Sequence, residues 1–167
     1  MKKYILFFTS LIALCACDNK DFLEKDSFSK YKPILISNEK LNICNWEKTP
    51  KDNKNITQTI KNGNTLLLLD YGLGIHFVDI SNPQIPQKIG FYFIPACIDM
   101  VLKESFIYTN NMNDLLKIDI NNPTNPSITT RKNDAFKITI VPPDELELSN
   151  ILKTLPKNTT IISYEKI

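Results

Sequence analysis

A tandem repeat constrains the fold of this chain more than any other feature of its sequence. The segment "FVDISNPQIP" at residues 77–86 returns as "KIDINNPTNP" at residues 117–126, an offset of 40 residues. Units of about 40 residues that hold several short strands are typical of β-propeller blades, and not of helical or leucine-rich repeats. The repeat therefore predicts an all-β fold of antiparallel sheet repeats that resemble part of a propeller. The identical positions are Asp79/Asp119, Ile80/Ile120, Asn82/Asn122, Pro83/Pro123 and Pro86/Pro126.

Apolar runs and turn residues divide the repeat region into strands. The run "NTLLLLDY" has strand length, and "GLGIHFVDI" follows it after a glycine-containing turn, so the two predict a hairpin. Pro83 and Pro86 end the second strand because proline cannot donate to a ladder. Before the repeats, Pro33 to Ile36 reads as extended, and Ser37 is a candidate cap for one helical turn. We expect repeat units near residues 56–95 and 96–140, an amphipathic helix near 143–155 and a final strand at 158–164 that resembles the start of a third unit.

The repeated polar residues are expected to build turns. A carboxylate at Asp79 or Asp119 can accept backbone N–H bonds from the following turn. Asn82 and Asn122 precede Pro83 and Pro123, which favours an extended or turn conformation. Calcium binding at the aspartates would need several more oxygen ligands nearby. These six residues are therefore predicted to be structural.

The N-terminus predicts export and lipid attachment. Lys2 and Lys3 precede an apolar run from Tyr4 to Leu14, which is shorter than the roughly 20 residues of a membrane-spanning helix. "LCAC" resembles a bacterial lipobox with Cys17 as the lipidated residue, whereas Cys15 would place the bulky Leu14 before the cleavage site. An ordinary cleaved secretory signal is the alternative. We expect a lipoprotein signal peptide at 1–16, a flexible tether at 17–32 and a β-repeat domain at 33–167, anchored in the cell envelope of a Gram-negative bacterium, at the outer membrane in preference to the inner.

Charge and cysteine content limit the partners. The chain has 20 basic and 18 acidic residues, and without Lys2 and Lys3 the two numbers are equal. A neutral chain does not favour a nucleic-acid partner, which needs a basic face. Cys44 and Cys97 permit a disulfide in an oxidising compartment, and two separately buried thiols are the alternative. One histidine cannot complete a zinc site alone, so we expect no metal and no cofactor.

No catalytic motif stands out. His76 aligns with Leu116 of the second repeat, which favours a packed strand residue over an acid–base catalyst. We therefore expect a non-catalytic binding or scaffolding module, bound to the membrane through its lipid and to an envelope protein or glycan. The alternative is a small carbohydrate-active or carbohydrate-binding protein, with a pocket that combines carboxylates with aromatic side chains such as Tyr71, Tyr92 and Tyr108.

The repeat resembles the LVIVD-repeat family of bacterial lipoproteins. The residues that carry the resemblance are "KPILIS", "GLGIHFVDISNP", "IPACIDMVL", "DLLKIDINNP" and "NDAFKI", between residues 32 and 140. The resemblance implies a β-propeller-like domain outside the cytoplasm with no established enzymatic activity, and Ala96 stands where glycine is usual. Two clear repeats are too few to close a propeller. Oligomerisation, a covering helix at 151–155 and a truncated family member without independent activity are the alternatives.

Overall fold

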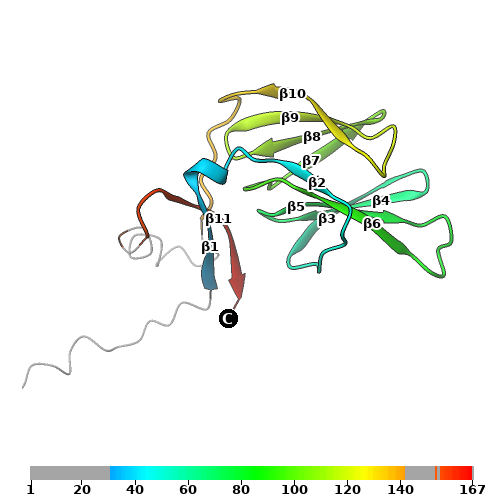
Figure 1. The fold of residues 1–167 in the computed structure, drawn as a ribbon, viewed down its shortest axis with the longest axis horizontal. Helices are drawn as coiled ribbons and strands as arrows, with labels where there is room; N and C mark the ends of the chain where they lie inside the picture. The colour runs from blue at the N-terminus through cyan, green and yellow to red at the C-terminus, as the bar shows by residue number, and fades with distance from the viewer. Residues whose placement is uncertain (1–30, 142–152, 154, 167) are drawn as a thin grey trace, which may run out of the picture.

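The computed structural model describes residues 31–141, 153 and 155–166. Within these ranges the chain forms antiparallel strands that pair into three sheets, together with one 3-10 turn (Figure 1). The all-β class and the antiparallel pairing predicted from the sequence are confirmed. The elements are β1 Tyr31–Ser37, η1 Asn38–Lys40, β2 Asn45–Glu47, β3 Ile56–Asn62, β4 Thr65–Asp70, β5 Gly74–Asp79, β6 Gln87–Phe93, β7 Met100–Lys103, β8 Phe106–Asn111, β9 Asp114–Asp119, β10 Ser127–Lys132 and β11 Thr159–Lys166.

The first sheet has the strand order β2-β6-β5-β4-β3. β4 and β5 form the expected hairpin, in which Leu67 pairs with Phe77 and Leu69 with Ile75. These four side chains are almost completely buried. Because successive strand residues point to opposite faces, Leu66 and Leu68 lie on the other face of the sheet. The continuous apolar run of β4 thus reflects a strand that is covered on both faces.

The second sheet repeats this arrangement with the order β10-β9-β8-β7. Met100, Ile107, Leu116 and Ile118 from this sheet pack in one apolar cluster with Leu67 and Phe77 from the first sheet. Figure 1 shows the two sheets stacked one above the other. Full burial of such a side chain contributes about 1.5–3 kcal/mol, so the contact between the two units forms the main core.

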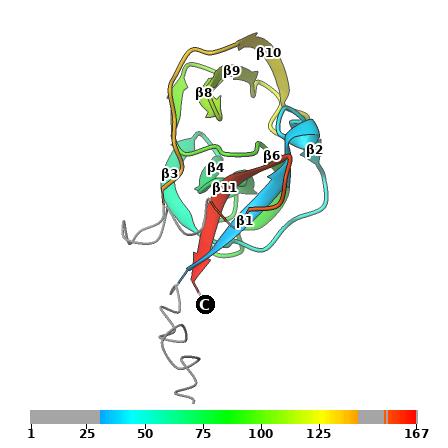
Figure 2. The ribbon, with the colours of Figure 1, turned by 90° about the vertical axis from the view of Figure 1, so that its left-hand side faces the viewer.

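The third sheet is a two-stranded ribbon made from both ends of the described chain. β1 pairs with β11 from Tyr31↔Lys166 to Ser37↔Thr159, with an irregularity between Ile34 and Leu35. Figure 2 shows the blue and red strands side by side in front of the two larger sheets. The final strand, expected to resemble the start of a third repeat, is therefore completed by the N-terminal strand and not by a further repeat segment.

The ribbon is locked to the first sheet by the turn between β4 and β5. Gly72 has a φ of +75°, and a Cβ at this position would overlap the carbonyl oxygen of Ile162 in β11. The Ser163 hydroxyl donates to the carbonyl oxygen of Tyr71 at 2.9 Å. Close backbone approach and a left-handed conformation are both properties that glycine provides. Gly72 is therefore the residue that lets the ribbon dock against the repeats.

Some sequence predictions differ from the structure or lie beyond the described ranges. β1 begins at Tyr31, two residues inside the segment assigned to the tether, and the short edge strand β2 was not expected. The turn after Ser37 forms, but the Ser37 side chain makes no capping bond. The signal peptide at 1–16, Cys17 and most of the helix near 143–155 lie outside the described residues, apart from Lys153 and Leu155.

Candidate functional site

The turn residues that the two repeats share make matching hydrogen bonds. Asp79 Oδ1 accepts bonds from the Ser81 amide at 2.8 Å and the Ser81 hydroxyl at 2.6 Å. Asp119 Oδ1 accepts bonds from the Asn121 amide at 2.8 Å and its side chain at 2.9 Å. The hydroxyl and amide of Ser81 hold the pKa of the exposed Asp79 below its usual value. Both carboxylates are thus engaged by the turn that follows them.

The asparagines of the same turns are also matched. Asn82 Oδ1 accepts a bond from the Gln84 amide, and Asn122 Oδ1 accepts one from the Thr124 amide, both at 3.1 Å. Pro83 and Pro123 follow these asparagines in the turns that lead into β6 and β10. The six repeated turn residues therefore occupy the outer turns of the two sheets, where they stabilise local backbone.

A second hydrogen-bond arrangement that recurs in both units was not predicted from the sequence. At the end of β4, the Asp70 carboxylate accepts bonds from the amides of Lys54 at 2.9 Å and Asn55 at 2.8 Å. At the end of β8, Asn110 Oδ1 accepts bonds from the amides of Ile98 at 2.9 Å and Asp99 at 3.4 Å. In both units, a side chain near the end of the second strand (β4 or β8) thus accepts the backbone amides of the two residues that precede the first strand (β3 or β7).

His76 lies beside this hydrogen-bond arrangement in the first unit. Its Nε2 atom is 3.0 Å from Asp70 Oδ2, and both side chains are 1% exposed. Burial raises the pKa of Asp70, but the bonds from His76 and from the two amides outweigh it, so the pKa lies below its ordinary value. The His76 ring packs on Phe91, with the centroids 4.6 Å apart. Its Nδ1 atom is buried without a hydrogen-bond partner. His76 is therefore a packed strand residue whose Nε2 atom contacts one buried carboxylate.

Both cysteines of the β-repeat domain are free thiols. Cys97 is fully buried, and burial raises its pKa to about 12 although its Sγ lies 2.9 Å from the Thr109 hydroxyl. Cys44 is half-buried. Burial raises the pKa of Cys44, and the Arg131 guanidinium, which donates to its Sγ at 3.3 Å, opposes this effect. The two thiols thus belong to one apolar cluster but differ in burial and in their polar partners.

Arg131 connects the second sheet to the segment before β2. Its Nη1 donates to Asp114 Oδ2 at 2.7 Å and to Asn111 Oδ1 at 2.9 Å, and its Nη2 donates to the carbonyl oxygen of Asn42 at 3.2 Å. One guanidinium thereby satisfies acceptors from three segments, which a lysine could not do with the same planar geometry. The contact fixes the chain that leads from the ribbon into β2.

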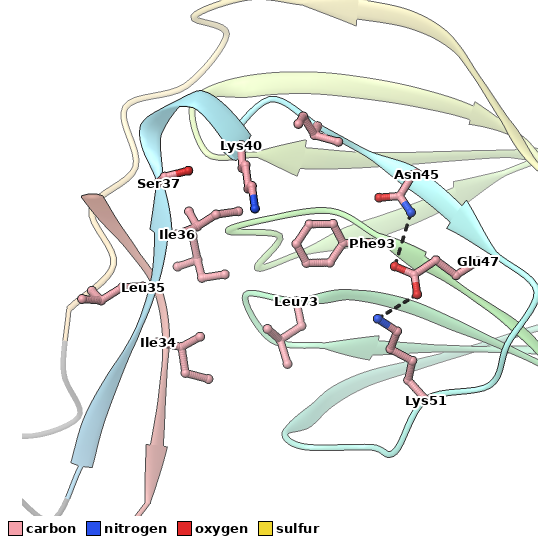
Figure 3. Close-up of a pocket in the computed structure, with 12 residues that line it drawn as sticks. Ile34, Leu35, Ile36, Ser37, Lys40, Asn45, Glu47, Lys51, Leu73 and Phe93 are labelled. Atoms are coloured by element: carbon pink, nitrogen blue, oxygen red, sulfur yellow. Dashed lines mark hydrogen bonds and ion pairs between the residues drawn. The ribbon is translucent and has the colours of Figure 1, made fainter. Parts of the chain in front are cut away.

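A large cavity lies between the ribbon and the first sheet. It has a volume of about 710 Å³, within the roughly 300–1,000 Å³ of ligand pockets. Figure 3 shows Ile34 and Ile36 of β1 facing Leu73 and Phe93 across this space, whereas Leu35 points away. Strands from both ends of the described chain (β1 and β11) and the first repeat contribute to its wall. The main apolar lining residues are Ile34, Ile36, Ile43, Leu73, Phe93 and Ile162.

Charged groups lie along one side of this cavity. Glu47 Oε2 pairs with Lys51 Nζ at 2.7 Å, and Glu47 Oε1 accepts a bond from Asn45 at 3.3 Å. The Lys40 side chain points between Ile36 and Phe93 (Figure 3). Among the interactions of the described residues, Lys40 has no ion pair. The cavity is thus apolar over most of its wall and carries one unneutralised cation at its edge.

The tyrosines proposed for a carbohydrate pocket do not converge. Tyr92 is buried in the main core, Tyr71 lines a pocket beside the ribbon, and Tyr108 lines a separate pocket on the second sheet. The pocket at Tyr108 also contains Asp99 and Phe136 and has a volume of about 380 Å³. It combines a carboxylate with two aromatic rings, without a second carboxylate in its lining.

Within the described ranges, no group of three or more His, Cys, Asp or Glu side chains could hold a metal ion. No helix in residues 31–141 or 155–166 has the length and apolar character needed to cross a membrane.

The fold and its matched turns define a β-repeat module built from two four-stranded meanders and a ribbon. A family model of the LVIVD repeat matches residues 97–134, which span the whole second meander. The first meander has the same strand order as the second and the same turn hydrogen bonds. Its Asp70 accepts backbone amides as Asn110 does in the second meander. Searches of curated proteins and of solved structures found no match to this chain.

Proposed function

We propose that this chain is a lipid-anchored, non-catalytic binding module of the bacterial cell envelope, built from propeller-like LVIVD-type blades. The observation that carries the binding role is the 710 Å³ cavity between the ribbon and the first sheet. Largely apolar, preformed concave sites are the usual ligand sites of proteins. The titratable pair at Asp70 and His76 is buried and engaged, which favours a structural role for it.

The sequence supports the anchor, and the position of β1 fits it. Cys17 follows an apolar run and a small residue, as in a lipobox, and 13 residues lie between Cys17 and Tyr31 at the start of β1. At no more than about 3.3–3.6 Å per residue, this segment spans less than about 50 Å. The ribbon and its cavity would therefore stay close to the membrane that holds the lipid.

The anchor is tested by labelling the full chain with an alkyne-bearing palmitate in a Gram-negative host. Wild type and Cys15→Ala should incorporate the label and remain with membranes after carbonate extraction. Cys17→Ala should lose the label, because the acceptor thiol is absent. Retention of the label in Cys17→Ala, or its loss in Cys15→Ala alone, would contradict the assigned lipid site.

The binding role is tested on crosslinked membranes. Wild type should retain a bound molecule that is lost from Ile36→Trp, in which the larger ring fills the cavity. A matched Ile128→Trp variant changes an apolar side chain of the second sheet that does not line this cavity. Equal recovery from wild type and Ile36→Trp would count against the cavity as the binding site.

The pocket at Tyr108 favours a second candidate function, carbohydrate binding. Phe136 is exposed there, and aromatic faces beside a carboxylate suit a sugar ring. A glycan array probed with the full chain should show binding that Tyr108→Ala removes. Absence of binding to any glycan would exclude this candidate and leave the proposal for the ribbon cavity untouched.

A further inference from the structure

We infer that the cavity between the ribbon and the first sheet binds a single acyl chain with an anionic headgroup. The inference deepens the binding role proposed above by naming the class of ligand. It follows from the separation of apolar and charged groups around the cavity. An amphiphile has the same separation, with its polar group confined to one end.

The apolar part of the wall matches an acyl chain. Ile34 and Ile36 face Leu73 and Phe93 across the space (Figure 3). Ile162 of β11 also lines the cavity. Ile43 also lines the cavity and is 52% exposed, so an apolar surface stays in contact with water unless a ligand covers it. A sugar or nucleotide would need polar partners on several sides of the cavity. A hydrocarbon chain needs none.

The charged side chains at the edge of the cavity favour a ligand with an acidic headgroup. Glu47 is already bound by Lys51 and Asn45, so its charge is neutralised within the protein. Lys40 is exposed, lies in the turn η1 and directs its amine toward the space between Ile36 and Phe93 (Figure 3). A long lysine stem that follows an apolar surface keeps its charged end in water. The cation is thereby placed where the headgroup of a bound acid would emerge.

The expected occupant is a free fatty acid of the envelope, which supplies both the acyl chain and the carboxylate. The acyl groups on a lipidated Cys17 would be joined through ester or amide bonds and would carry no anionic headgroup. They are a competing occupant of the apolar wall, and the experiment below separates the two.

The test uses the full chain in cell extracts and a long-chain fatty acid that carries a photoreactive diazirine. The probe should crosslink to peptides from β1 and β6. Shortening the acid should weaken competition with the probe by about fourfold per methylene removed. The corresponding fatty alcohol, which lacks the negative charge, should label these peptides less. Equal labelling by acid and alcohol, or labelling confined to peptides outside the cavity, would overturn the inference.

Charge reversal gives a matched comparison. Lys40→Glu should lower labelling by the acid about tenfold and leave labelling by the alcohol unchanged, because only the headgroup contact is altered. Lys103→Glu changes another exposed lysine, in the second sheet and away from the cavity, and should label like wild type. Urea unfolding of each variant shows whether the fold is intact. A fold-intact Lys40→Glu that labels like wild type would overturn the role of the cation.

The two occupants are separated by Cys17→Ala. Cavity labelling in both wild type and Cys17→Ala supports a free fatty acid as the ligand. Labelling that appears only in Cys17→Ala would overturn the inference in favour of the protein's own acyl chain. Labelling in neither overturns the inference. In that case membrane retention of wild type, and its loss in Cys17→Ala, would still support the proposed anchor.

Discussion

The Nε2 atom of His76 lies 3.0 Å from Oδ2 of Asp70, and the Asp70 carboxylate also accepts the backbone amides of Lys54 and Asn55. One buried carboxylate thus joins β4, β5 and the loop before β3. The corresponding position in the second unit is Asn110, which binds two amides without a histidine. The His76 contact is therefore an addition, found in the first unit, to a role common to both units, in which one side chain accepts two backbone amides.

Replacing Asp70 should destabilise the protein strongly. Asp70→Ala leaves two backbone amides and the His76 ring without their acceptor in a buried site, at a cost of about 2–5 kcal/mol. Urea unfolding of the full chain measures the change. Asp52→Ala is the control, because Asp52 is exposed and lines the same small pocket as Asp70. Equal stability of the two variants would show that the Asp70 contacts contribute little.

Asp70→Asn should cost less than Asp70→Ala. The asparagine side chain keeps one carbonyl oxygen, and Asn110 shows that this oxygen alone can accept both amides in the second unit. The charge-assisted contact with His76 is lost, which accounts for the remaining effect. If Asp70→Asn were as damaging as Asp70→Ala in the same urea experiment, the equivalence of the two positions would be wrong.

The stability of the wild type should fall in acid because of Asp70. Its folded-state pKa lies below the ordinary aspartate value of about 3.9, so the unfolded chain binds more protons in this range. The stabilisation is fully present above that value and is lost as the pH falls through the folded-state pKa. Unfolding of wild type and Asp70→Asn between neutral and acidic pH should show their difference shrinking as the pH falls. Asp79, whose pKa is also lowered, is present in both proteins and cancels.

Local pattern predicts the repeats well because their contacts are close in sequence. The hairpin of β4 and β5 follows from alternation and a short turn, and its register puts Leu68 opposite His76 and Asp70 opposite Gly74. Asp70 and His76 then lie diagonally on one face, since alternate residues share a face. The pair could therefore have been found from the predicted hairpin alone.

The ribbon and the cavity could not be found in this way. Tyr31 pairs with Lys166 across nearly the whole described chain, and no local pattern in either strand names its partner. The cavity wall is built from β1, β6, β11 and the turn at Leu73, so it exists only once that pairing is known. Trp46 in β2 likewise gains its place by packing on Phe77 and Tyr92 from other strands.

Gly63 and Gly72 both have a positive φ, yet replacing each with alanine should lower the free energy of unfolding by different amounts. Gly63 has a φ of +57° with open space around its Cβ position, so Gly63→Ala costs only the left-handed conformation, about 1–2 kcal/mol. Gly72 has a φ of +75° and no room beside Ile162 and Ser163, so Gly72→Ala adds about 1–3 kcal/mol of overlap.

Urea unfolding compares the two glycine variants. Limited proteolysis within β11 should also increase in Gly72→Ala and not in Gly63→Ala, because only Gly72 contacts the ribbon. Similar losses of stability, with similar protection of β11, would contradict the docking of the ribbon at this turn.

The two thiols should differ in reactivity under native conditions. Burial raises the pKa of Cys97 to about 12, which leaves almost no reactive thiolate at neutral pH, and its side chain is out of contact with water. Cys44 is half-buried beside Arg131 and should react first with iodoacetamide, slowly because its own pKa is raised. Mass spectrometry of peptides from the folded full chain should show modified Cys44 and unmodified Cys97, and both modified after unfolding in urea. A peptide pair joined through Cys44 and Cys97, recovered from exported protein, would instead demonstrate a disulfide.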